Sequence, residues 1–514
     1  MHPLWDQLER AASLRGDQPA VRSGSQALSW REALGMAGRM ACVLSGNGVR
    51  DGAGVALISP NSLAGLLLPF AAECAGGMFV PLNNRLTCAE LVEQLLDFRP
   101  ALLLAAPPYV DIAREAAAIA GVPVMLLGDV AEGDEPRFDS LAADAEPLAP
   151  CGISRDAPVA IYYTGGTTGR AKGVILTSDR LAMNALQWAH AVGARQDEHL
   201  LVVAPMFHMV AGLNCIIAAV LACDLTILDR FTPAGTLDAI SKLKVTNLAM
   251  VPAMIEMLFA EPGFAGHDLS SLRILTYGGS PISQPTLAAT LENFPGVRLY
   301  QVYGQTEGGP TVSILGPEWH TLDPAHAGRL HSAGKPLALT AIRIIRPDGS
   351  ACDRGETGEI LVRGPAVSPG YWNRPEETAA AYRDGWLHTG DAGYLDGDSF
   401  LFIVDRIKDM IVSGGENVYA AEVERVIVLH PAVRDCAVIG IPSERWGEAV
   451  HAIVRLEDGA RADEAVIIAF CREHISAFKL PRSVEFREAP FPLTGANKVD
   501  KRALRKDHAG TSAN

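Results

Sequence analysis

The sequence predicts a large layered α/β domain followed by a small α+β domain. In the first 130 residues, short apolar runs alternate with helix-like segments, the pattern of a largely parallel sheet covered by helices. The same alternation continues to about residue 400. After Asp405 the segments are fewer and form a compact α+β pattern, so we place a boundary near Arg406–Lys408, with domains 1–407 and 408–514.

The expected elements follow from these patterns in order. Four apolar runs are typical of buried strands: Val55–Ile58, Phe79–Leu82, Ala101–Ala105 and Val122–Leu127. Thr87 and Glu90 form a capping box that predicts a helix ending before Pro100. In the small domain we expect a helix at Ala421–Leu429, strands near Cys436–Ile441 and Val450–Leu456, and a helix from Asp463.

Composition excludes several functional classes. A formal net charge of −15 argues against a nucleic-acid partner. The nine cysteines contain no C-x-x-C pair, which argues against zinc fingers and a disulfide framework and favours a reducing, cytoplasmic location. The apolar run Cys215–Cys223 has nine residues, whereas a membrane span needs about 18. We therefore expect no integral membrane association, and homodimer formation stays open.

A glycine- and threonine-rich loop is the first candidate site. Val159–Tyr163 predicts a strand, and Thr164, Gly165, Gly166, Thr167, Thr168, Gly169 and Lys172 follow it. Glycines let a backbone approach phosphate closely, while hydroxyl, N–H and ammonium groups can meet its oxygens. Gly173 after Lys172 excludes a Walker A loop. The alternative is a plain β-hairpin in which Ile175–Thr177 returns as the second strand.

This loop resembles that of the acyl- and aryl-CoA synthetases in the adenylate-forming superfamily. Relatives usually read Thr-Ser-Gly-Thr-Thr-Gly-x-Pro-Lys-Gly, and here Gly165 replaces the serine and Ala171 the proline. Further segments match that family in the same order along the chain. The resemblance implies ATP and Mg²⁺ as cofactors, coenzyme A as co-substrate, and a small mobile C-terminal domain.

The matching segments carry the roles that the resemblance implies. An adenine-binding turn is formed by Gly278, Gly279 and Ser280. The next matching segment consists of Tyr303, Gly304, Gln305, Thr306 and Glu307. Its tyrosine stacks on adenine, its threonine contacts the α-phosphate and its glutamate helps to hold Mg²⁺. Asp391 and Arg406 bind the ribose, and Lys408 is the hinge. Gly414 and Gly415 line the CoA tunnel. Lys498 is the adenylation lysine, although Asn497 stands where relatives place glycine.

The acid and CoA sites follow from the same resemblance. His208 is expected to form a gate between the acyl pocket and the thiol tunnel. The pocket candidates are His208, Met209, Val210, Gly279, Val302, Gly308, Gly309 and Pro310. Trp446 and Phe478 are candidates to flank the CoA adenine, and Arg85 to meet its phosphates. The pocket set is apolar, which favours an aromatic, arylacrylic or fatty monocarboxylic acid over a dicarboxylic acid.

The expected activity is an ATP-dependent acid–CoA ligase that forms an acyl-AMP and releases AMP and pyrophosphate. A peptide-synthetase adenylation domain is the nearest alternative. Amino-acid-activating relatives place an aspartate soon after the pocket aromatic residue, whereas His208 follows Phe207 here. A catalytically inactive protein that binds a nucleotide or an acyl-CoA and a luciferase-type oxygenase are further alternatives.

Overall fold

A computed structural model describes residues 3–128, 134–152, 154–164, 171–280, 282–323, 327–413, 416–443, 445–493 and 499–511. The chain divides into two compact units. The first contains most of the chain up to Ile342 together with Val362–Leu387, and the second contains Arg343–Leu361 and the chain from His388 onward.

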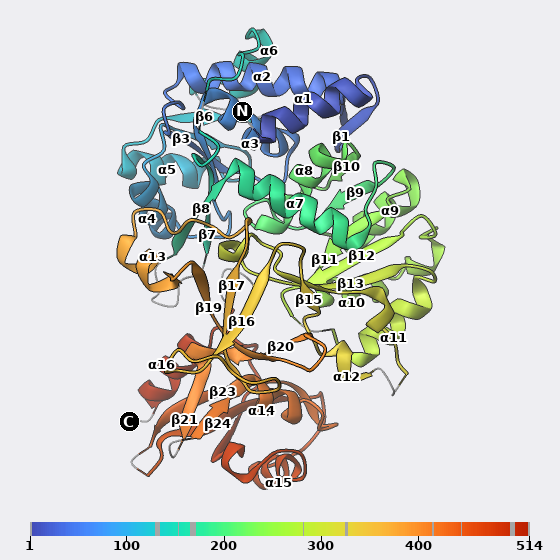
Figure 1. Ribbon diagram of the computed structural model, residues 1–514, viewed down its shortest axis with the longest axis vertical. Helices are drawn as coiled ribbons and strands as arrows, with labels where there is room; N and C mark the ends of the chain where they lie inside the picture. Colours follow the sequence, from blue (N-terminus) through green and yellow to red (C-terminus); the bar gives the residue numbers. More distant parts are fainter. Residues whose placement is uncertain are drawn as a thin grey trace. The chain divides into compact units, whose positions relative to one another are not determined.

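A nine-stranded sheet forms much of the first unit (Figure 1). Its order is β15-β14-β13-β12-β11-β9-β10-β1-β2, and the six strands from β13 to β1 pair in parallel. The strands are β1 (Pro19–Ser23), β2 (Gln26–Ser29), β9 (His199–Val202), β10 (Asp224–Ile227), β11 (Asn247–Met250), β12 (Ile274–Gly278), β13 (Arg298–Tyr303), β14 (Ser313–Leu315) and β15 (Lys335–Pro336).

A six-stranded sheet of order β6-β5-β3-β4-β7-β8 completes the first unit's strand layers. It consists of β3 (Gly54–Ile58), β4 (Met78–Pro81), β5 (Leu102–Ala105), β6 (Val124–Leu126), β7 (Pro158–Thr164) and β8 (Lys172–Thr177). All of its pairs are parallel except β7 with β8. The four strands expected before residue 130 are therefore confirmed, each within two residues at either end.

Helices cover these sheets. They are α1 (Pro3–Arg15), α2 (Trp30–Gly46), α3 (Leu63–Ala75), α4 (Cys88–Phe98), α5 (Val110–Ala120), α6 (Phe138–Asp144), α7 (Ser178–Val192), α8 (Met209–Leu221), α9 (Pro233–Leu243), α10 (Pro252–Phe259), α11 (Gln284–Asn293), α12 (Ala327–Leu330) and α13 (Pro375–Ala381). The capping box of Thr87 and Glu90 is present on α4. Helices α3 and α8 are apolar and almost wholly buried, because neighbouring elements cover them on nearly every side.

The parallel strands place the candidate segments at one edge. The segments Ala204–His208, Gly279–Ser280 and Gly304–Glu307 follow β9, β12 and β13. These strands run parallel in one sheet, so their carboxyl ends lie along the same edge. Ligands of open α/β sheets commonly bind at that edge.

The second unit contains the small-domain elements. One sheet has the order β22-β21-β24-β23, with β25 paired to β24. Its strands are β21 (Met410–Ser413), β22 (Glu416–Tyr419), β23 (Val433–Ser443), β24 (Gly447–Leu456) and β25 (Ser483–Phe486); its helices are α14 (Ala420–Ile427), α15 (Glu464–His474) and α16 (Lys501–Thr511). The two strands and two helices expected here are present, and Asp463 caps α15.

A further sheet has the order β16-β17-β19-β18, with β20 paired to β19. Its strands are β16 (Ala341–Ile345), β17 (Gly358–Arg363), β18 (Tyr382–Arg383), β19 (Trp386–Leu395) and β20 (Leu401–Arg406). Residues from His388 to Arg406 precede the expected 407/408 boundary but belong to the second unit. That boundary stays a prediction about where the chain rotates. The predicted fold class, a large α/β domain with a smaller C-terminal domain, is confirmed.

Candidate active site

The flanks of the glycine-rich loop form a hairpin. Strands β7 and β8 pair antiparallel, with Thr164 directly opposite Lys172. The antiparallel pairing that the hairpin alternative expected is therefore present in the flanking strands, and Ile175–Thr177 belong to the second of them. Gly165, Gly166, Thr167, Thr168 and Gly169 lie outside the described residues.

Glu307 lies at the centre of a polar cluster in the first unit. The 3₁₀ turn Thr306–Gly308 directly after β13 presents it, and only 9% of the residue is exposed. Thr164 Oγ1 lies 3.4 Å from Glu307 Oε1, and the Tyr371 hydroxyl donates to the same oxygen over 3.1 Å. The backbone N–H of Ser368 donates to the Glu307 carbonyl over 2.9 Å. These contacts fix a nearly buried carboxylate beside the phosphate-loop hairpin, where a hard cation such as Mg²⁺ fits.

Tyr371 links this carboxylate to Lys172. The Lys172 ammonium lies 5.0 Å from the centroid of the Tyr371 ring, within cation–π range. Backbone pairing holds Tyr371 in place. Tyr371 forms an isolated antiparallel β-bridge with Val174, and the Trp372 N–H donates to the Gly173 carbonyl over 2.8 Å. Sequence reasoning missed Tyr371, which belongs to none of the quoted motifs.

The expected adenine-binding turn and the segment beside it require their glycines. A Cβ on Gly278 would lie 2.6 Å from the Val302 carbonyl oxygen, and one on Gly304 would lie 2.0 Å from the Pro310 carbonyl oxygen. Gly279 has a φ of +81°, in the left-handed region that side chains avoid. Gly278 and Val302 are direct partners on β12 and β13, so the structure brings this turn beside the Tyr303–Gln305 segment. Ser280 is exposed.

A neutral histidine supports β12 beneath that turn. The Tyr277 hydroxyl lies 3.0 Å from His320 Nε2 and 3.1 Å from Gln301 Oε1. Burial lowers the pKa of His320 to about 4, so its ring is uncharged at neutral pH. The network therefore fixes the strand end without adding charge near the nucleotide segments.

One stretch of the expected acyl-pocket residues is His208–Val210. His208 directly precedes α8, and its ring centroid lies 4.5 Å from that of Phe207. Met209 is buried, whereas Val210 is 47% exposed. The Arg85 guanidinium lies 5.6 Å from the Phe207 ring, so this CoA candidate is close to the pocket segment.

The second pocket stretch is Gly308–Pro310. A Cβ on Gly308 would lie 2.7 Å from Val312 Cγ2, and one on Gly309 would lie 2.4 Å from the Ala366 carbonyl oxygen. Buried Asn184 on α7 holds the following residue with two hydrogen bonds, donating to the Thr311 carbonyl over 2.8 Å and accepting from its N–H over 3.2 Å. Asn184 was not predicted from the sequence.

The second unit holds the ribose and hinge candidates. Asp391 and Arg406 form an ion pair of 2.7 Å. Lys408 is exposed within the 3₁₀ turn Ile407–Asp409. The next residue, Asp409, pairs with Arg505 on α16 at 3.2 Å. Gly414, Gly415 and Lys498 lie outside the described residues.

The CoA candidates of the second unit have basic neighbours. The guanidinium groups of Arg445 and Arg482 each lie 4.8 Å from the Trp446 ring centroid. Phe478 is 37% exposed, and the Lys479 ammonium lies 5.4 Å from its ring centroid. Arg445, Arg482 and Lys479 were not predicted. Arg445 and Lys479 adjoin these rings in the sequence, whereas Arg482 reaches Trp446 because the chain before β25 pairs with β24.

Comparison with known proteins identifies the family. The profile of the AMP-binding enzymes matches residues 8–372, more than half of the chain. The chain belongs to the AMP-binding enzyme family. The profile of the AMP-binding enzyme C-terminal domain matches residues 422–498 as well.

Several named relatives of this AMP-binding enzyme are acid–CoA ligases. A feruloyl-CoA synthase of Amycolatopsis sp is 39% identical over 97% of both chains. An indoleacetate–CoA ligase of Aromatoleum aromaticum is 35% identical over 98% of both chains. A long-chain-fatty-acid–CoA ligase of Mycobacterium tuberculosis is 34% identical over 94% of both chains.

Solved structures of similar enzymes agree. The o-succinylbenzoate CoA synthetase of Bacillus subtilis in complex with its acyl-adenylate intermediate has a TM-score of 0.86 and 30% identity, with 98% of both chains covered. The same enzyme with ATP and a magnesium ion has a TM-score of 0.84 and 30% identity, covering 97% of this chain and 98% of that one.

The functional predictions are confirmed at the level of the family. The protein is an AMP-forming acid–CoA ligase that acts through an acyl-adenylate and uses ATP, Mg²⁺ and coenzyme A. Its partners are therefore small molecules. Among the residues that the structure describes, no helix is long and apolar enough to cross a membrane.

Proposed function

We propose that this protein converts an aryl or arylacrylic monocarboxylic acid into its CoA thioester. The observation that carries this assignment is the Gly308–Gly309 pair directly after Glu307, because neither glycine adds a side chain to the predicted acid pocket. The feruloyl and indoleacetate ligases among the relatives support the same class of acid.

The first half-reaction activates the carboxylate. A carboxylate is a poor electrophile because its charge repels nucleophiles and its oxide leaves poorly. Lys172 and the Thr164–Gly169 loop bind the β- and γ-phosphates in this proposal, while Thr306 contacts the α-phosphate. Lys498 bridges the substrate carboxylate and the α-phosphate, where negative charge accumulates in the transition state.

Glu307 holds Mg²⁺ during this step. The Thr164 and Tyr371 hydroxyls orient the carboxylate through their contacts with Oε1. When bound, Mg²⁺ offsets the charge of the phosphate oxygens. Tyr303 stacks on the adenine. The adenine is also surrounded by Gly278, Gly279, Ser280, Gly304 and Gln305. Asp391 and Arg406 bind the ribose.

The second half-reaction replaces Lys498 with the thiol of CoA. We propose that the C-terminal part, residues 408–514, rotates about Lys408 between the two steps. Gly414 and Gly415 then line the thiol tunnel and His208 gates it. Trp446, Phe478 and Arg85 bind the CoA nucleotide; Arg445 and Arg482 beside Trp446 support this role, because guanidinium groups suit phosphate oxygens.

A fatty acid is the second candidate substrate. The pocket segment Met209–Val210 is apolar, and the fatty-acid ligase of M. tuberculosis is 34% identical. The charge balance and cysteine spacing support a cytoplasmic location. A homodimer stays open.

A panel of acids separates the two candidates. Acyl-CoA formation would be measured by mass spectrometry with benzoate, a cinnamate, an indole acid and fatty acids of about 8 to 16 carbons as the probes, which spans roughly the size range of such pockets. We expect kcat/KM for the best aryl acid to exceed that of every fatty acid by at least about 10-fold. A fatty acid as the best substrate would contradict the assignment.

A pocket variant adds a second test. Gly308→Ala adds a methyl group 2.7 Å from Val312 Cγ2, so the circular dichroism spectrum and thermal unfolding of the variant are compared with those of the wild type before the assay. We expect the variant to lose about 10-fold in kcat/KM for the bulky arylacrylic acid and to retain benzoate activity. Equal loss with both acids would place Gly308 outside the pocket.

A further inference from the structure

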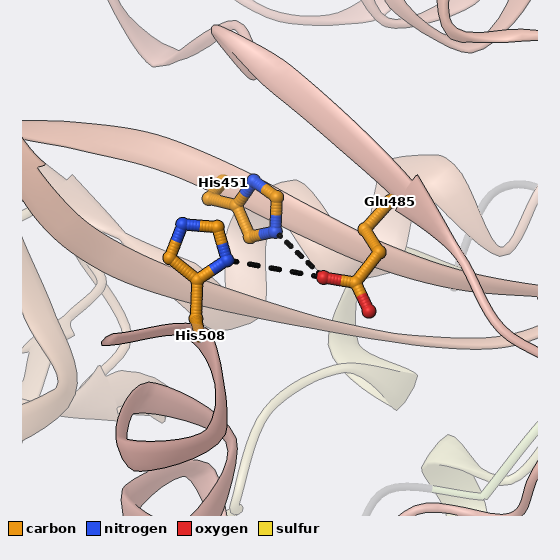
Figure 2. Close-up of side chains that lie close together, drawn as sticks. All are labelled: His451, Glu485 and His508. Carbon is orange, nitrogen blue, oxygen red and sulfur yellow. Dashed lines mark ion pairs between the residues drawn. The ribbon is translucent and has the colours of Figure 1, made fainter. Parts of the chain in front are cut away.

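A cluster of metal-ligand side chains lies in the second unit, outside the adenylation motifs. His451 comes from β24, Glu485 from β25 and His508 from α16, and Figure 2 shows the three side chains pointing toward one another. Their nearest ligand atoms all lie within 4.8 Å of one another. Glu485 Oε2 lies 3.6 Å from His451 Nε2 and 3.8 Å from His508 Nδ1.

His451 has a buried ring nitrogen directed at this cluster. The residue is only 3% exposed, and its Nδ1 lies 2.7 Å from Ser483 Oγ. Its Nε2 makes no hydrogen bond within the described part of the chain, and 3.6 Å to Glu485 is too long for one. A buried polar atom without a partner costs free energy, so a ligand between Nε2 and the carboxylate would remove that cost.

The surroundings of His451 suit metal ligation. Metal-bound histidines typically use their second nitrogen in a hydrogen bond that fixes the ring, as Nδ1 does here with Ser483. The ring is thus held with Nε2 facing Glu485 (Figure 2).

We propose that His451, Glu485 and His508 bind a divalent transition-metal ion, with Zn²⁺ the best match. Zinc bonds of about 2.0–2.2 Å in a tetrahedral site separate the ligand atoms by roughly 3.3–3.6 Å. The observed 3.6 and 3.8 Å to the carboxylate oxygen therefore need to close by only a few tenths of an ångström. Water completes the fourth position.

This ion is distinct from the magnesium of the ligase reaction. Mg²⁺ prefers carboxylate, phosphate and water oxygens, whereas two imidazoles and one carboxylate suit zinc and its neighbours. The site would join α16 to β24 and β25. Helix α16 begins at Lys501, three residues after Lys498, so bound metal would fix the helix that follows the adenylation lysine.

Zinc titration of the full-length protein tests the proposal. Chelator-treated, dialysed protein would be titrated calorimetrically with ZnCl₂ in excess MgCl₂. We expect one equivalent to bind, and His508→Gln and Glu485→Gln each to weaken binding by at least about 10-fold. His474→Gln is the matched control, because His474 is exposed on α15 and its Nδ1 lies 2.8 Å from the Phe470 carbonyl. That variant should bind as the wild type does.

Two results would overturn the proposal. One is the absence of stoichiometric zinc binding by the wild type. The other is equal zinc affinity in the wild type, His508→Gln and Glu485→Gln, which would place the ion elsewhere, for example on cysteines. Co²⁺ provides an independent readout: visible ligand-field bands without a thiolate charge-transfer band are expected, and these bands should be lost in His508→Gln. An intense thiolate band would contradict the proposed ligands.

Discussion

Asp391 and Arg406 are direct partners on the antiparallel strands β19 and β20, and their side chains form an ion pair of 2.7 Å. The Asp391 side chain is 5% exposed, whereas that of Arg406 is 41% exposed. The Asp391 N–H also donates to Thr389 Oγ1 over 3.0 Å. The carboxylate that we assign to the ribose is therefore oriented by its strand neighbours before any nucleotide binds.

Asp391→Ala should weaken ATP binding and leave the ranking of acids unchanged. The variant removes an acceptor for ribose hydroxyls, and a charged hydrogen bond contributes about 2 kcal/mol, or roughly 30-fold in Kd. Calorimetry with a non-hydrolysable ATP analogue measures this. Asp398→Ala, an exposed substitution on the loop after β19, is the control. An altered acid ranking would move Asp391 out of the ribose site.

Lys498→Ala should slow adenylation strongly and spare thioester formation from supplied acyl-AMP. Loss of a cation at the α-phosphate is expected to slow the first half-reaction by about 100- to 1,000-fold. Single-turnover assays of each half-reaction make the comparison. Lys506→Ala, at an exposed position on α16, should change neither. Equal losses in both half-reactions would show that this division of roles is wrong.

Tyr371→Phe should weaken the response to Mg²⁺. The variant lacks the hydroxyl that donates to Glu307 Oε1. Groups that hydrogen-bond to a metal-ligating residue typically change metal affinity by about 10-fold or more when they are removed. Adenylation rates at increasing Mg²⁺ concentration provide the measurement, with Tyr109→Phe at the start of α5 as the control. An unchanged half-saturating Mg²⁺ concentration would exclude Tyr371 from the magnesium site.

Glu73→Gln should flatten the dependence of stability on pH. Glu73 is buried on α3, accepts from the Trp5 N–H over 2.7 Å and from the Ser178 hydroxyl, and burial raises its pKa to about 7. The folded state thus keeps a proton that the unfolded state releases near its ordinary value of 4.5. The free energy of unfolding then falls as pH rises from about 5 to 7, by up to about 3 kcal/mol.

Denaturant unfolding at pH 5.5 and pH 8 would measure that slope. The amide introduced by Glu73→Gln is neutral at both pH values, so the variant should lose most of the difference. Glu115→Gln, an exposed substitution on α5, should retain it. The same slope in Glu73→Gln as in the wild type would show that Glu73 is ionised in the folded protein.

Local patterns predicted the elements well. Strands β3 and β5 are apolar runs bounded by polar or turn residues, and α4 carries its start signal in Thr87 and Glu90. Strand β23 shows the limit of this reasoning. We expected Cys436–Ile441, but it spans Val433–Ser443, because pairing with β24 extends through polar ends as far as Ser443 opposite Gly447.

Contacts between distant segments were beyond sequence reasoning. The Tyr371 hydroxyl donates to Glu307, which lies 64 residues earlier in the sequence. An isolated β-bridge between Tyr371 and Val174 on β8 positions the tyrosine for this contact. The cluster of His451, Glu485 and His508 depends on the parallel register of β25 with β24 and on the placement of α16. Register is set by whole-sheet packing, so no spacing rule along the chain predicts which side chains converge.

Acid-dependent exchange of labelled pyrophosphate into ATP, measured without CoA, tests the central claim most directly. The acyl-adenylate account predicts rapid exchange that requires both Mg²⁺ and the preferred aryl acid, together with net turnover to the thioester only when CoA is added. Absence of exchange with an acid that is nevertheless converted to its CoA thioester would contradict an acyl-AMP intermediate in this protein.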